Sequence, residues 1–158
     1  MAKLMRSTAL MAGVGAVIAI GPATVGARPV RKGKVDSGIV YFGITHTVGG
    51  NLYAAGSSAD KLFGAGAVTY VIQTTRTPTG GFEMRSKPVT LFFSNGTLTG
   101  TASATVTPGA GGTTLTDGKL MASNGTGGQK RHSLTATFQG IGNPVSGTYR
   151  ITYTGVYR

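Results

Sequence analysis

Strict two-residue alternation over residues 97–107 is the feature that most limits what this chain can fold into. Small and aliphatic residues occupy one face of the segment, and Thr or Ser occupies the other; the first set is Leu98, Gly100, Ala102, Ala104 and Val106. A period of two is that of a strand with one buried and one solvated face, as in antiparallel sheets. We therefore expect an all-β fold with the threonines toward water. No stretch after residue 35 has the apolar period of a long helix.

Similar alternating runs, separated by tight-turn dipeptides, divide the rest of the chain into further strands. Asn95-Gly96, Asp117-Gly118 and Asn124-Gly125 tolerate the positive φ of hairpin turns. The pattern predicts eight or nine short strands, at 35–47, 51–57, 64–75, 81–86, 88–94, 97–107, 113–122, 131–139 and 147–157. One helical turn with a serine cap is expected over residues 57–63.

The small residues Gly100, Ala102 and Ala104 favour a barrel over a sandwich. Such a series either lets another backbone approach closely or leaves space inside a barrel for a ligand or for large side chains from opposite strands. We predict a small antiparallel β-barrel as a single domain over residues 35–158. Since the chain has no cysteine, no disulfide holds this domain together, and thiol chemistry and Cys-ligated metal are excluded.

The first residues have the pattern of a secretory signal. Lys3 and Arg6 precede a mostly apolar run from Ala9 to Ile20, and Val25-Gly26-Ala27 offers small residues for cleavage after Ala27. The pattern predicts a signal peptide helix over residues 1–27 and a protein that is secreted or held in the cell envelope. A retained N-terminal anchor is the alternative, although the run is short for a membrane span.

Positive charge is concentrated directly after the predicted cleavage site. The formal net charge of the chain is +11, and a flexible arm at residues 28–34 carries Arg28, Arg31, Lys32 and Lys34. A cationic arm outside the cell would be attracted to an anionic envelope polymer or to lipid headgroups. The alternative is that the arm is only a solvated segment that remains after cleavage of the signal peptide. Nucleic acid is not an expected partner, because the compartment is wrong and no motif combines aromatic with basic residues.

Glycine-rich turns and their flanking strands between residues 62 and 140 follow a further pattern. Its segments are Leu62-Phe63-Gly64-Ala65-Gly66, Val68-Thr69-Tyr70, Val89-Thr90-Leu91-Phe92-Phe93, Asn95-Gly96-Thr97-Leu98 and Asn124-Gly125-Thr126-Gly127-Gly128. Over about half the chain, this pattern resembles the allene oxide cyclase and dirigent-like β-barrel superfamily. The resemblance implies an eight-stranded barrel with an interior cavity, and activities that range from cyclising a fatty-acid epoxide to steering phenoxy-radical coupling. The chain departs from the family pattern at residues 129–132, where Gln-Lys-Arg-His replaces the small Gly-Ala pair of the family.

Acidic and basic groups suited to catalysis are few. Asp36, Asp60 and Asp117 are predicted in turns or on the surface, and no two carboxylates share a predicted face, which argues against a two-carboxylate glycosidase. His46 and His132 have the parity of apolar strand residues, so each is expected to point inward near a barrel mouth, or else to be a partly exposed or hydrogen-bonded histidine. Two histidines without a third ligand do not predict a metal site.

Tyrosines are the other residues expected to line a cavity with polar groups. Together with the two histidines, the candidates for lining the cavity are Tyr41, Tyr70, Tyr149 and Tyr153. The alternative is that these rings pack the core and close the barrel ends.

Three functions fit these features. The first is a non-catalytic secreted barrel that binds a small apolar ligand or an envelope component. The second is a cofactor-independent isomerase or cyclase that positions a hydrophobic substrate, with His46, His132 and interior tyrosines as polar anchors. The third is a structural or adhesive surface protein that uses its Thr-rich outer face and has a barrel filled by side chains. Because one barrel fold can host many activities, the fold alone does not choose among them.

Overall fold

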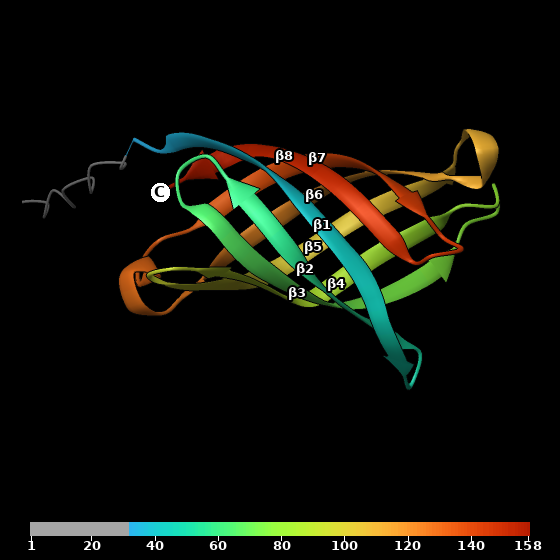
Figure 1. The fold of residues 1–158 in the computed structure, drawn as a ribbon, viewed down its shortest axis with the longest axis horizontal. Coiled ribbons are helices and arrows are strands. Elements are labelled where there is room, and N and C mark those ends of the chain that lie inside the picture. Colours follow the sequence, from blue (N-terminus) through green and yellow to red (C-terminus); the bar gives the residue numbers. More distant parts are fainter. Residues whose placement is uncertain (1–31) are drawn as a thin grey trace, which may run out of the picture. The chain divides into compact units, whose positions relative to one another are not determined.

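Eight antiparallel strands form a closed barrel in the computed structural model, which describes residues 32–158 (Figure 1). The strands are β1 (Lys34–Val48), β2 (Asn51–Asp60), β3 (Gly64–Arg76), β4 (Phe82–Phe93), β5 (Gly96–Pro108), β6 (Thr114–Gly125), β7 (Leu134–Asn143) and β8 (Thr148–Tyr157). Neighbours in sequence pair with each other, and β8 closes the barrel on β1. The predicted small antiparallel barrel is confirmed. The predicted signal peptide, with Arg28 and Arg31 of the arm, lies outside the described residues.

Three local predictions differ from the structure. Asp117-Gly118, expected in a hairpin turn, lies in the middle of β6 and pairs with both β5 and β7. Residues 81–86 and 88–94 form one strand, β4, which passes through the cis Lys87–Pro88 peptide and changes register between Ser86 and Val89. Such an irregularity accommodates proline within a strand, so the barrel has eight strands. The helical turn predicted at 57–63 is wrong, because β2 continues to Asp60 and pairs there with both β1 and β3. Within residues 32–158, no helix is long and apolar enough to cross a membrane.

β5 has the inner and outer faces that its alternation predicts. Leu98 and Val106 are buried, whereas Thr101 and Thr105 are exposed. The buried core next to β5 consists of aliphatic side chains from six strands: Val40, Val68, Val89, Leu91, Leu120, Ala122, Leu134, Ala136 and Ile151. Burial of these side chains is the main favourable contribution to folding in a domain without disulfides.

Three inward-facing aromatic residues pair directly with a glycine on the adjacent strand. Tyr153 faces Gly38, Phe138 faces Gly118, and Tyr149 faces Gly142; these pairs are register partners. A Cβ atom at any of these glycines would collide with the opposite ring. Each ring therefore lies against the barrel wall where its neighbour has no side chain, an arrangement that leaves more of the interior unoccupied.

One end of the barrel is closed by side chains. The short helical turn η2 (Gly127–Gln129) places Gln129 in this end, where its Nε2 donates to Asn95 Oδ1 at 2.7 Å and its Oε1 accepts from the Tyr157 hydroxyl at 2.7 Å. Phe63 packs beside Phe93 and Tyr157, with ring centroids 4.6 and 4.8 Å away. We call this the η2 end. The opposite end carries the turn η1 (Ala110–Gly112) and is called the η1 end (Figure 1).

Candidate ligand-binding cavity

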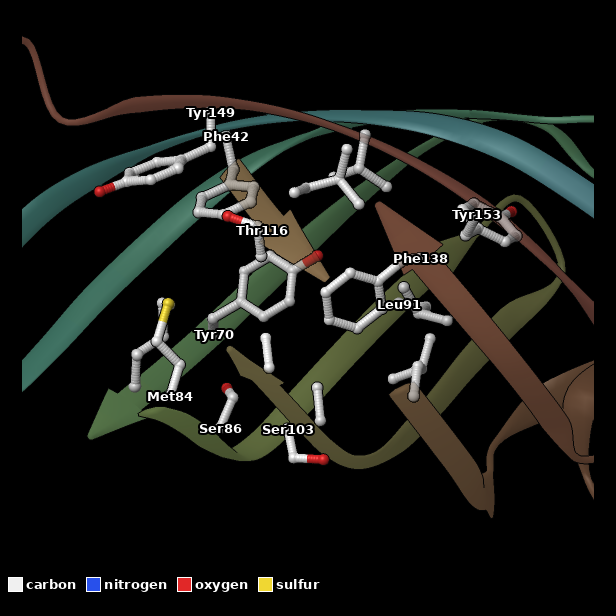
Figure 2. Close-up of a pocket in the computed structure, with 16 residues that line it drawn as sticks. Phe42, Tyr70, Met84, Ser86, Leu91, Ser103, Thr116, Phe138, Tyr149 and Tyr153 are labelled. Carbon is white, nitrogen blue, oxygen red and sulfur yellow. The ribbon is translucent and has the colours of Figure 1, made fainter. Parts of the chain in front are cut away.

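The barrel interior contains a cavity of about 60 Å³ (Figure 2). Every strand except β2 contributes to its lining, which is mostly apolar: Val40, Phe42, Tyr70, Ile72, Met84, Ser86, Leu91, Ala102, Ser103, Ala104, Thr116, Leu120, Phe138, Tyr149, Ile151 and Tyr153. Ala102 and Ala104 are the inward residues of β5 that line the cavity, and their short side chains leave space that longer residues would fill. The small-residue face recognised in the sequence is therefore one wall of this cavity.

Three of the tyrosines predicted as candidates line the cavity. Tyr149 and Tyr153 lie at opposite sides of the close-up, and Tyr70 lies between them (Figure 2). Burial raises the pKa of all three side chains above the ordinary value of 10.0. These hydroxyls consequently stay neutral at physiological pH and can both donate and accept hydrogen bonds.

Tyr41 and His46 do not line the cavity, which corrects the prediction for both. Tyr41 lies next to the inward-facing Val40 in β1, so its side chain points outward and is 51% exposed. His46 is exposed because a bulge shifts the register between Ile44 and His46, which reverses the parity of the strand beyond it. The His46 ring stacks on Tyr53 on the outside, with centroids 4.5 Å apart.

His132 also lies outside the cavity, at the η2 end. It precedes β7 and so does not continue the alternation of that strand. Its Nδ1 is 3.1 Å from the backbone oxygen of Arg158, and its ring stacks on Tyr157. The two histidines are thus at opposite ends of the barrel and do not form a common site. Tyr157 helps to close the η2 end, which agrees with the alternative expectation that some tyrosine rings close the barrel ends.

The Thr116 hydroxyl in the cavity wall is fully buried and has no hydrogen-bond partner. Thr116 is 6% exposed and lines the cavity, and its Oγ1 is unpartnered. Ser86, by contrast, donates from its Oγ to the backbone oxygen of Val71 at 2.9 Å. An unpaired buried hydroxyl is unfavourable, since it has lost its hydrogen bonds to water without replacing them. Thr116 is therefore a polar group of the wall that a ligand could satisfy.

Two carboxyl groups lie inside the barrel toward the η2 end, although Asp36 and Asp60 were predicted in turns or on the surface. Both are buried. Asp60 does support the turn after β2, because its Oδ1 accepts hydrogen bonds from the backbone N–H groups of Leu62 and Phe63, each at 2.8 Å. Its other oxygen, Oδ2, accepts a hydrogen bond from the Tyr153 hydroxyl. Tyr153 thereby connects the cavity wall to Asp60.

Asp36 lies near the carboxyl group of Asp60. The Asp36 Oδ1 accepts from the backbone N–H of Ser37 at 2.8 Å, whereas its Oδ2 has no partner. Burial, and after it the nearby charge of Asp60, raise the pKa of Asp36 from 3.8 to about 6. The expectation that no two carboxylates share a face was wrong. The signal was present in the sequence, since Asp36 has the parity of Val40 and Phe42 in β1.

A larger groove of about 600 Å³ lies next to the cavity, toward the η1 end. Phe42 and Tyr149 line both spaces. Their rings are stacked, with centroids 5.0 Å apart and an angle of 12° between the planes. These two rings therefore form a wall that the small cavity and the open groove share.

Within residues 32–158, no three His, Cys, Asp or Glu side chains gather into a group that could hold a metal ion.

Comparisons with protein-family models, with curated proteins and with solved structures found no match to this chain.

Proposed function

We propose that the protein binds a small apolar ligand inside its barrel. The observation that carries the proposal is the cavity itself, whose lining is mostly aliphatic and aromatic and includes no charged residue. Pockets of this kind, apolar with a few polar groups, are typical of small-molecule sites. Transfer of an apolar ligand from water into such a space is favourable in proportion to the apolar surface that it buries.

The size of the cavity limits the ligand to a compact molecule. An apolar cavity of about 150 Å³ takes up benzene, whereas the cavity here is about 60 Å³. A single-ring ligand therefore requires displacement of Phe42 or Tyr149 toward the groove. A long acyl chain would require much larger rearrangement.

The other two functions have less support. The isomerase or cyclase hypothesis used His46 and His132 as polar anchors, and neither side chain lines the cavity. A structural or adhesive protein was expected to have its barrel filled by side chains, and the cavity favours ligand binding over that function. Membership of the allene oxide cyclase and dirigent-like superfamily stays a prediction from its turn motifs.

Filling the cavity tests the proposal. Leu in place of Ala102 would occupy part of the space, so we expect Ala102→Leu to weaken the binding of toluene by tenfold or more, measured by titration with NMR detection. The matched control is Thr101→Leu, which adds an apolar side chain to the exposed face of the same strand. Thr101→Leu should bind toluene like the unchanged protein. Absence of toluene binding to the unchanged protein, or equal affinities in both variants, would contradict the proposal.

We also propose that the chain is exported and that cleavage occurs after Ala27. The support is the charged, apolar and small-residue sequence of residues 1–27. N-terminal sequencing of the protein recovered from the culture medium or cell envelope should find Arg28 as the first residue. An N-terminus at Met1 or Ala2 would favour a retained anchor.

A further inference from the structure

We propose that the ligand of the cavity is a neutral, mostly apolar molecule with one hydroxyl or carbonyl group, and that Thr116 binds this group. The inference rests on the proposed function and defines the class of ligand within it. It depends on the chemistry of one side chain in the wall and on the absence of charge among the lining residues around it.

Thr116 has the properties expected of a recognition group. Its hydroxyl is buried in the cavity wall without a hydrogen-bond partner. A ligand oxygen placed beside it would restore the hydrogen bond that burial has removed. Since a hydroxyl can donate one hydrogen bond and accept others, both alcohols and carbonyl compounds are suitable partners.

The remaining lining determines the rest of the ligand. A charged ligand would have no opposite charge among the lining residues and would lose its hydration on entering. Tyr70 also lines the cavity. Its hydroxyl is neutral, because burial raises its pKa. The aliphatic and aromatic side chains that form most of the wall match the apolar part of the ligand.

Phenol and toluene provide a matched pair of probes, since they are similar in size and shape and differ in the hydroxyl group. We expect Thr116→Val, which replaces the hydroxyl by a methyl group of similar volume, to weaken phenol binding by about threefold to tenfold, as for loss of one hydrogen bond. Toluene binding should stay the same or become tighter. The quantity to measure is the ratio of the two dissociation constants, by NMR titration of the folded full chain.

Thr114→Val is the matched control. Thr114 lies on the same strand, and its Oγ1 is also buried without a partner, but it is not among the lining residues of the cavity. The ratio should therefore be unchanged in Thr114→Val. If Thr116→Val does not fold, Thr116→Ala removes the same hydroxyl without a branched replacement.

The outcomes separate this inference from the proposed function. A change of the ratio in the Thr116 variant alone supports the inference. If both probes bind and the ratio is the same in all variants, Thr116 does not recognise the ligand, whereas the cavity still binds it. If neither probe binds the unchanged protein, the proposed function fails and this inference fails with it.

Discussion

Asp36 is a carboxyl group buried inside the barrel, a position that its chemistry disfavours. A carboxyl group loses hydration on burial, and here it also lies near the carboxyl of Asp60. Its pKa is about 6 in the folded chain and 3.8 as the ordinary value. The folded state therefore holds this proton more tightly than the unfolded state does. The contribution of Asp36 to stability is fully present below pH 3.8 and is lost as the pH rises through about 6.

Asp36→Asn should remove the loss of folding stability that ionisation of Asp36 causes. We expect the variant to be more stable than the unchanged protein at pH 7.5, by at most about 3 kcal/mol, and to gain less at pH 5. Urea unfolding at the two pH values measures the difference. The control is Asp117→Asn on the outer surface, where the change should stay within about 0.5 kcal/mol. If Asp36→Asn lowers the stability at pH 7.5, ionised Asp36 is favourable in the fold and the prediction is wrong.

At the scale of the strand, alternation was sufficient to predict the inner and outer faces but not the irregularities. The parity of β5 correctly placed Ala102 and Ala104 toward the interior, because that strand keeps its alternation between Gly100 and Val106. The same reasoning failed for His46, since one extra residue in β1 reverses the faces, and no dipeptide marks it. Contacts such as Asp60 with Tyr153 depend on strands far apart in sequence, so local patterns could not predict them.

The pairing of aromatic residues with glycines can be tested in β1. Gly38→Ala would place a methyl group against the Tyr153 ring and the backbone oxygen of Ala59. We expect a loss of about 1–3 kcal/mol in the free energy of unfolding, as for other overpacked interiors. Gly43→Ala is the control on the same strand, because its added Cβ would meet nothing closer than 3.8 Å. Denaturant unfolding should therefore separate the two variants, and equal stabilities would contradict close packing of Tyr153 on Gly38.

For the folded domain as a whole, the buried carboxyl groups change the charge of the surface. From Val35 onward the sequence has nine Lys and Arg residues against four Asp and Glu residues. All nine basic residues are exposed, whereas two of the four acidic residues, Asp36 and Asp60, are buried. The barrel surface is therefore more positive than composition alone indicates. This surface adds to the predicted arm, of which Lys32 and Lys34 are exposed in the structure, with Lys34 as the first residue of β1.

The arm and the barrel surface can be compared as sites of contact with anionic material. In the predicted mature chain, beginning at Arg28, we expect replacement of Arg28, Arg31, Lys32 and Lys34 by Gln to weaken binding to phosphatidylglycerol vesicles by about tenfold or more, because clustered basic residues contribute about 1 kcal/mol each near an anionic membrane. Sedimentation with vesicles at increasing NaCl measures this, and added salt should weaken binding of the unchanged protein as well.

The matched control replaces four basic residues of the barrel, Lys61, Arg76, Arg85 and Lys87, by Gln and so has the same net charge as the arm variant. These residues come from β3, β4 and the turn after β2, and a closed barrel does not bring all its outer surface to one flat membrane at once. The control should therefore lose less affinity than the arm variant. Equal losses would assign the attraction to net charge and not to the arm, and equal binding to neutral phosphatidylcholine vesicles would exclude an electrostatic contact of either kind.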